Sequence, residues 1–358
     1  MLIASILLAL LAVVLAWPVP LLLGRASWPS RAPASALVLW QAIALAGGLS
    51  MIGALLTFGL IPFGDSLIPS ATSLARELSR NPAQPAADIW YLLALCAAVL
   101  LSGHLVLNLV LTIVTTERQR RRHRQLIELL ASPDPSRPNT RVLENDVPVA
   151  YCLPGALRSI TVFSQGLVTL LSPAELRAVI AHEEAHVTQR HDLLLVAFGA
   201  WHTSLPWFPI AYRAQREVGA LVEMLADDRA RHKVDDRTLA AAIVIVAGGQ
   251  VGVSAVPDAE GSGSGLTSIG GGAGGFGGPG AGTAGSAAGT RLGVGRGGSG
   301  DANADSGWAG QSASARQTRA RVSRLLEDSP TFPLGARIAV AAISLALVAV
   351  PTILLISR

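Results

Sequence analysis

Four long apolar runs constrain this chain most, because each has the roughly 20 residues that a helix needs to cross a bilayer. We expect membrane-spanning helices at residues 2–23, 36–61, 89–114 and 336–356. Apolar residues make up 51% of the chain and charged ones 15%, which is typical of a membrane protein. The first run lacks the basic start of a signal peptide, so we predict that it is retained.

The arginines are distributed unevenly around these runs. Arg25 and Arg31 lie between the first two, and a cluster follows the third: Arg118, Arg120, Arg121, Arg122 and Arg124. The positive-inside rule places both groups in the cytoplasm, with the N-terminus outside the cell membrane. The cluster is either an anchor on anionic lipids or a docking site for a partner. No helix-turn-helix or zinc-knuckle spacing is present, so no direct nucleic-acid binding is expected.

The remaining chain suggests three further segments. Residues 118–256 are expected to form a compact cytoplasmic domain, with short strands at 147–153 and 159–163. Residues 257–315 are rich in Gly, Ser and Ala and are predicted to be a disordered linker. Residues 316–330 carry four arginines beside apolar positions, which predicts a basic amphipathic segment at the cytoplasmic face: Arg316, Arg319, Arg321 and Arg324.

The pentapeptide HEEAH lies on a predicted helix that begins at Ser172, with Glu175 in the position of a capping box. His182 and His186 are one turn apart and therefore share a face of this helix. Two imidazoles at this separation can hold one zinc ion. Glu183 would then lie beside the metal, where it could take a proton from a bound water molecule.

A catalytic zinc site usually has three protein ligands. The best third ligand is Glu223, on a second predicted helix, and Asp227 lies one turn further along. Asp227 could accept a hydrogen bond from a ligand histidine and thereby select its tautomer. The alternative is that both are ordinary solvated acids on a charged helix.

The apolar stretch from Leu193 to Tyr212 separates the two metal helices. If it crossed the membrane, Glu223 and His182 would lie on opposite sides, so we predict a helical hairpin that is buried or lies at the membrane surface. His191 is too far along to ligate in place of His186 unless the helix bends.

Two polar residues, His104 and Asn108, lie one turn apart within the third apolar run. Polar groups are costly in a bilayer, so the pair is either a functional site or a source of hydrogen bonds between helices. We favour the hydrogen bonds.

HEEAH followed by EMLAD, after the lead-in SPAEL, resembles the beta-lactam sensor (BlaR/MecR) membrane metallopeptidases and, more distantly, the HtpX-like and CAAX prenyl protease group. The resemblance implies an α-helical multi-pass membrane protein with a cytoplasmic, mainly helical α+β, zincin-like (gluzincin) domain. It implies that His182, His186 and Glu223 bind one zinc ion, that Glu183 is the general base, and that Asp227 supports a ligand.

In such peptidases an edge strand near the HExxH helix pairs with the substrate. Here the candidate comprises Ser159, Ile160, Thr161, Val162 and Phe163, and the alternative is a plain core strand. The beta-lactam sensors carry an extracellular penicillin-binding domain after the last span. This sequence ends at Arg358, directly after that span, so a beta-lactam signal is not expected.

We therefore predict a membrane zinc endopeptidase that contacts lipids and cleaves a protein. By resemblance, the substrate could be a cytoplasmic DNA-binding repressor. One alternative is an HtpX-like protease that clears damaged membrane proteins, and another is a non-catalytic zinc-bearing receptor or scaffold. The sequence leaves the oligomeric state open.

Overall fold

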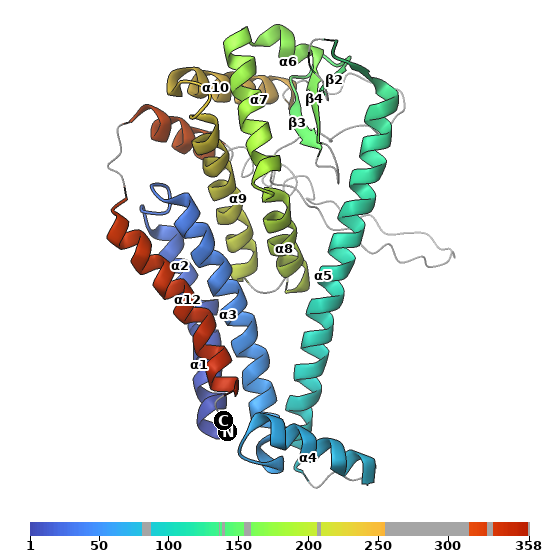
Figure 1. Cartoon of the computed structure of the whole chain (residues 1–358), viewed down its shortest axis with the longest axis vertical. Helices are drawn as coiled ribbons and strands as arrows, with labels where there is room; N and C mark the ends of the chain where they lie inside the picture. The colour runs from blue at the N-terminus through green and yellow to red at the C-terminus, as the bar shows by residue number, and fades with distance from the viewer. Residues whose placement is uncertain are drawn as a thin grey trace, which may run out of the picture. The chain divides into compact units, whose positions relative to one another are not determined.

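The computed structural model describes residues 1–80, 87–135, 137, 140–153, 159–205, 209–254, 315–327 and 332–356. These residues are mostly helical (Figure 1). The chain divides into two compact units, of which the first comprises Met1–Leu126, His186–Ala226 and Ser329–Arg358, and the second Ile127–Ala185 and Asp227–Asp328. The predicted linker at 257–315 lies outside the described residues, apart from its last position.

The first unit contains four helical stretches that are long and apolar enough to cross a membrane. They comprise α1 (Leu2–Ala16) with α2 (Pro18–Arg25), α3 (Pro33–Gly59), α5 (Ile89–Leu130) and α12 (Leu334–Ile356). Helices α1 and α2 are separated at Trp17, because Pro18 opens α2 and has no N–H to continue α1. That these helices cross a membrane remains a prediction. The residues assigned to the four spans are α-helical except Trp17 and residues 60–61, which follow the end of α3.

Helix α3 lies at the centre of the first unit, and α1 and α12 pack against it. Its C-terminal end approaches α5 at Gly59. A Cβ atom on Gly59 would lie 2.5 Å from Cγ of Leu95 and 2.9 Å from the carbonyl oxygen of Tyr91. The missing side chain therefore allows the backbones of α3 and α5 to come this close, as small residues do between membrane helices.

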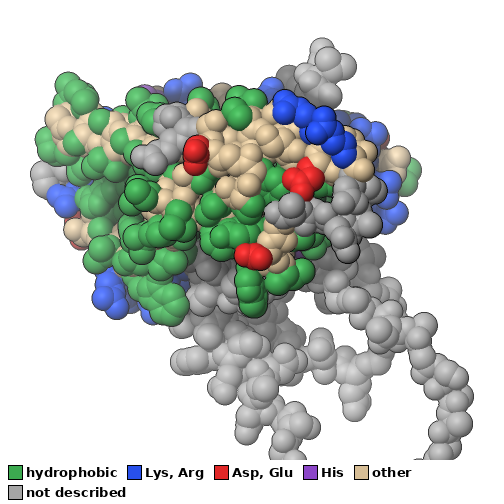
Figure 2. All heavy atoms as spheres, turned by 90° about the horizontal axis from the view of Figure 1, so that it is seen from below, with side chains coloured by type: hydrophobic (Ala, Val, Ile, Leu, Met, Phe, Trp, Pro, Cys, Tyr) green, Lys and Arg blue, Asp and Glu red, His purple; other side chains and the backbone are tan. Residues whose placement is uncertain are grey.

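A short 3-10 helix, η1 (Ile61–Phe63), and the amphipathic helix α4 (Leu67–Arg80) connect α3 to α5. Seen from the end where α4 lies, hydrophobic side chains cover much of the described surface, with a few charged ones between them (Figure 2). Ile68 and Leu78 of α4 are among the exposed apolar residues.

A helical hairpin is present at the predicted stretch, 193–212, but its second arm is the helix that carries Glu223. It consists of α8 (His191–Ser204) and α9 (Pro209–Ala230), which run in opposite directions (Figure 1). Helix α8 approaches α3 closely, since a Cβ atom on Gly48 would lie 3.2 Å from the Trp201 ring. Phe198 of α8 is buried in one cluster with Trp40 and Ile43 of α3, so the hairpin is built into the core of the first unit.

The polar pair on α5 reaches this hairpin. Nδ2 of Asn108 donates to the carbonyl oxygen of Ala200 at 2.7 Å and to Oγ of Ser204 at 2.6 Å. Nε2 of His104 lies 3.1 Å from the carbonyl oxygen of Ser204. The favoured interpretation, hydrogen bonding between helices, is confirmed.

The second unit contains a four-stranded sheet in the order β1-β2-β4-β3. The strands are β1 (Ala131–Pro133), β2 (Thr140–Leu143), β3 (Ala150–Leu153) and β4 (Ile160–Ser164). Strand β4 pairs in parallel with β2 and antiparallel with β3. The prediction that residues 159–163 form an edge strand for a substrate is therefore wrong, because both sides of β4 are occupied. The alternative, a core strand, agrees with the structure.

Helices α6 (Gln165–Leu170), α7 (Pro173–Thr188) and α10 (Asp236–Ser254) complete this unit with a helix at residues 315–326. Phe163 of β4, Leu167 of α6 and Leu176 of α7 form one buried cluster. The units do not follow the sequential domains expected from the sequence, because α8 and the first part of α9 pack with the N-terminal helices.

Candidate metal centre

The capping box predicted for α7 is present. The backbone N–H of Ser172 donates to Oε2 of Glu175 at 2.8 Å, and the N–H of Glu175 donates to Oγ of Ser172 at 3.3 Å. These bonds satisfy two amides that the first turn of a helix leaves without partners. They define the start of α7, and the regular helix from there places His182 and His186 one turn apart on one face.

The division between the units runs through α7 and α9, each of which is one continuous helix. Glu223 and Asp227 are one turn apart on α9, as the histidines are on α7. In the first unit, Nε2 of His186 lies 3.6 Å from Oε1 of Glu223. In the second, Nδ1 of His182 lies 2.9 Å from Oδ1 of Asp227. Each histidine therefore faces one acid of α9.

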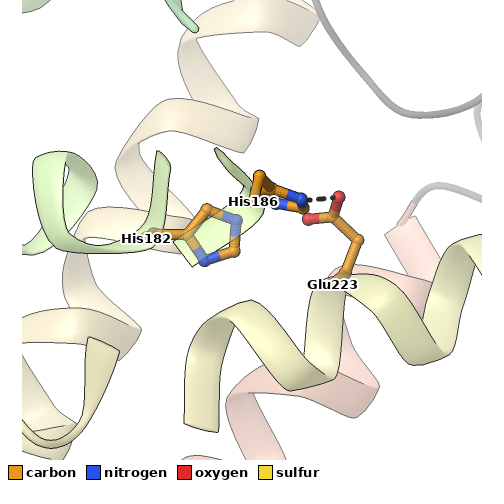
Figure 3. Close-up of side chains that lie close together, drawn as sticks. All are labelled: His182, His186 and Glu223. Atoms are coloured by element: carbon orange, nitrogen blue, oxygen red, sulfur yellow. Dashed lines mark ion pairs between the residues drawn. The ribbon is translucent and has the colours of Figure 1, made fainter. Parts of the chain in front are cut away.

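His182, His186 and Glu223 form a group that could hold a metal ion, with one potential ligand atom of each within 4.8 Å of the others (Figure 3). Their side chains are 12%, 21% and 15% exposed, so the site is largely buried but solvent still reaches it. Two imidazole nitrogens and one carboxylate are a ligand set that zinc accepts, and three protein ligands leave a fourth position for water or substrate. The donor set therefore fits a catalytic zinc ion.

The two glutamates of HEEAH have different surroundings. Glu184 is exposed, and its Oε2 accepts a hydrogen bond from Nζ of Lys233 at 2.6 Å. Glu183 is half-buried and lies between the two ligand histidines in the sequence. Burial raises the pKa of the nearby Cys152 thiol to about 12, and the charges of Glu183 and Glu184 contribute. Strand β3, which carries Cys152, is therefore close to these glutamates.

Asp227 is almost completely buried, with 1% of its side chain exposed. Burial alone would raise the pKa of this carboxyl group, but hydrogen bonds from Arg321 and then from His182 outweigh it. The pKa of Asp227 therefore lies below its ordinary value, and the group is a carboxylate at neutral pH.

His191 is a residue of this region whose role the sequence did not reveal. Arg190 adopts a left-handed backbone conformation (φ 50°) between α7 and α8, so the chain does bend after HEEAH. The bend places Nδ1 of the buried His191 3.1 Å from Nδ1 of His186. His191 does not replace His186 as a ligand but contacts its ring. The sequence offers one sign of this contact, which is a second histidine five residues after His186.

Residues 115–232 match the model of Peptidase family M48. This stretch is similar to that peptidase family. It contains all three candidate ligands, Glu183 and Asp227, and it covers well under half of the chain. The comparison supports a metallopeptidase domain in a chain with several apolar helices.

A curated relative, Protease HtpX homolog 2 from Methanosarcina mazei, is 29% identical over 101 residues, which are 28% of this chain and 34% of the relative. The chain thus matches about a third of the length of this relative. No solved structure matches the chain. These comparisons support the HtpX-like part of the expected resemblance, and the link to the beta-lactam sensors remains a prediction.

Proposed function

We propose that this protein is a membrane-embedded, zinc-dependent endopeptidase. The observation that carries the proposal is the convergence of His182, His186 and Glu223, from two helices, within 4.8 Å of one another. The similarity of residues 115–232 to Peptidase family M48 supports the same activity.

In this proposal His182, His186 and Glu223 hold the zinc ion. Glu183 transfers the proton, and Asp227 orients a ligand. The bound ion would lower the pKa of a water molecule and polarise the scissile carbonyl group. Glu183 takes the proton from the water and delivers it to the leaving amine. Nδ1 of His182 lies 2.9 Å from Oδ1 of Asp227, and a proton held on Nδ1 against this carboxylate would leave Nε2 as the nitrogen that can bind the metal.

The first unit supports a site close to the membrane surface. Nη1 of Arg120 on α5 lies 2.9 Å from Oδ2 of Asp192, the second residue of α8. Arg120 follows the predicted end of the third span, Val114, by six residues, which is about 9 Å along a helix. His186 lies just before this point of α8, so we place the site at the cytoplasmic surface, on the side assigned by the arginine distribution.

Strand β3 is the better candidate for substrate binding now that β4 is known to be internal. Within the described residues, β3 has one neighbouring strand, and its other edge can accept an extended peptide. Its proximity to Glu183, seen in the electrostatic influence on Cys152, would bring such a peptide toward the catalytic group.

Two substrate classes fit this proposal. One is a single regulatory protein, such as a cytoplasmic DNA-binding repressor. The other is a broad set of membrane proteins that require removal, which the similarity to Protease HtpX homolog 2 favours. A non-catalytic zinc scaffold is the third candidate, but a structural site has no need of a glutamate at position 183.

The test compares new protein N-termini in cells that express the wild type, Glu183→Ala or Glu184→Ala at equal levels. We expect fragments with the wild type and with Glu184→Ala, because Glu184 has a structural partner in Lys233. None should form with Glu183→Ala. Fragments from one DNA-binding protein would support signalling, and fragments from many membrane proteins would support quality control. Full cleavage by Glu183→Ala would contradict the mechanism.

A further inference from the structure

The helix at residues 315–326 packs onto the helix that carries HEEAH, although more than 120 residues separate them. Its Leu325 is 4% exposed and is buried in one cluster with Ala178 and Ala181 of α7 and Leu239 of α10. Val322 packs against the same cluster. The helix is therefore part of the core of the second unit.

Two arginines of this helix bind consecutive acids of α9. Nε and Nη2 of Arg321 donate to Oδ2 and Oδ1 of Asp227, each at 2.7 Å. Nη2 of Arg324 donates to both carboxylate oxygens of Asp228 at 2.6 Å. The other two arginines, Arg316 and Arg319, are exposed.

The two ion pairs differ in their surroundings. The side chains of Arg321 and Asp227 are 14% and 1% exposed, whereas that of Asp228 is 33% exposed. Oδ1 of Asp227, which accepts from Arg321, also lies 2.9 Å from Nδ1 of His182. Asp227 thus lies between a guanidinium group and a candidate metal ligand, and it is far more deeply buried than Asp228.

A buried carboxylate needs both charge compensation and an orienting partner. The planar guanidinium of Arg321 supplies two parallel hydrogen bonds, which fix the position of the carboxylate as well as its charge. A lysine would supply the charge without this geometry. The orientation of Asp227 in turn determines which ring nitrogen of His182 carries the proton.

We propose that the helix at residues 315–326 completes the metal centre, and that Arg321 is a positioning residue that holds Asp227 against His182. This inference rests on the proposed function, because it takes His182 as a zinc ligand. It makes zinc binding depend on a segment that lies outside the matched region 115–232 and joins α12 a few residues later.

The test measures the zinc dissociation constant of the purified full chain by competition with a chromogenic chelator. We expect Arg321→Gln to weaken zinc binding about 10- to 100-fold, the usual effect of losing a residue that supports a ligand. Arg321→Lys should lie between Arg321→Gln and the wild type. Arg324→Gln is the matched control, since it removes the neighbouring ion pair of the same helix, and it should leave zinc affinity unchanged.

Two further measurements separate positioning from folding. The visible spectrum of the cobalt-substituted chain should change in Arg321→Gln and not in Arg324→Gln, because it reports ligand geometry. Asp227→Asn should weaken zinc binding, and adding Arg321→Gln to it should cause little further loss, because Arg321 acts through Asp227.

Equal losses of zinc affinity in Arg321→Gln and Arg324→Gln would overturn the proposal, since docking of the helix would then be all that matters. An unchanged zinc affinity and cobalt spectrum in Arg321→Gln would overturn it as well. A wild-type chain that binds no zinc would overturn the proposed function itself, and this inference with it.

Discussion

Nδ1 of His191 lies 3.1 Å from Nδ1 of His186, and Nε2 of the same His191 lies 2.7 Å from Oε1 of Gln189. An amide oxygen can only accept, so Nε2 of His191 is the donor and its Nδ1 accepts from His186. This arrangement leaves Nε2 of His186 unprotonated, and that nitrogen lies 3.6 Å from Oε1 of Glu223. His191 thus does for His186 what Asp227 does for His182.

Replacing His191 with phenylalanine should lower zinc affinity about 10-fold, because the ring that orients His186 is then unable to accept a hydrogen bond. Chelator competition on the purified chain measures the change. His202→Phe is the control, since His202 lies in the last turn of α8, away from the ligands. Equal zinc affinity in His191→Phe and the wild type would show that His186 needs no such partner.

Replacing Glu223 with glutamine should abolish stoichiometric zinc binding, because a neutral amide binds zinc much more weakly than a carboxylate does. Metal analysis of the purified chain by mass spectrometry gives the zinc content directly. Glu217→Gln is a control on the same helix, since Glu217 pairs with Arg216 instead of a histidine. A full zinc complement in Glu223→Gln would mean that another residue provides the third ligand.

Replacing Gly59 with alanine should destabilise the packing of α3 against α5 by about 1–3 kcal/mol, the usual cost of overpacking. The new Cβ atom would lie 2.5 Å from Cγ of Leu95 and 2.9 Å from a backbone oxygen, which cannot move aside. Thermal unfolding in detergent measures the effect. Gly103→Ala on α5 should cause no loss, because no atom of another described element lies within 4 Å of its new Cβ.

The thiol of Cys152 should react slowly with iodoacetamide in the folded chain, because burial raises its pKa to about 12. An ordinary thiol has a pKa of about 8.5. The folded state therefore favours the neutral thiol, and this contribution to stability is lost as the pH rises from about 8.5 toward 12. In a Cys96→Ser background, the alkylation rate should rise sharply on unfolding at pH 8. A folded rate equal to the unfolded rate would contradict the burial of Cys152.

The local features of the site could be read from the sequence because they depend on residues within a few turns of one another. The capping box of Ser172 and Glu175 and the helical spacing of His182 and His186 are of this kind. The break between α8 and α9 was predictable for a related reason, because proline is tolerated in the first turn of a helix, as Pro209 is in α9, but disfavoured in a helix interior.

The role of β4 was not predictable in the same way. Its apolar, β-branched residues indicate a strand, but a strand's position in a sheet depends on which partners the rest of the chain provides. Strand β2 pairs directly with β4, although β3 comes between them in the sequence, so β4 is internal and β3 lies at the edge of the described sheet.

The sequence by itself determined the apolar helices, the helix that carries HEEAH and the two pairs of metal-site residues on α7 and α9, since periodicity and capping are local properties of the chain. Only the tertiary structure decided which groups orient the candidate ligands. His191 reaches His186 through one left-handed residue, Arg190, and Arg321 reaches Asp227 from 94 residues away. Such contacts arise from the way the helices pack, which no local pattern of residues specifies.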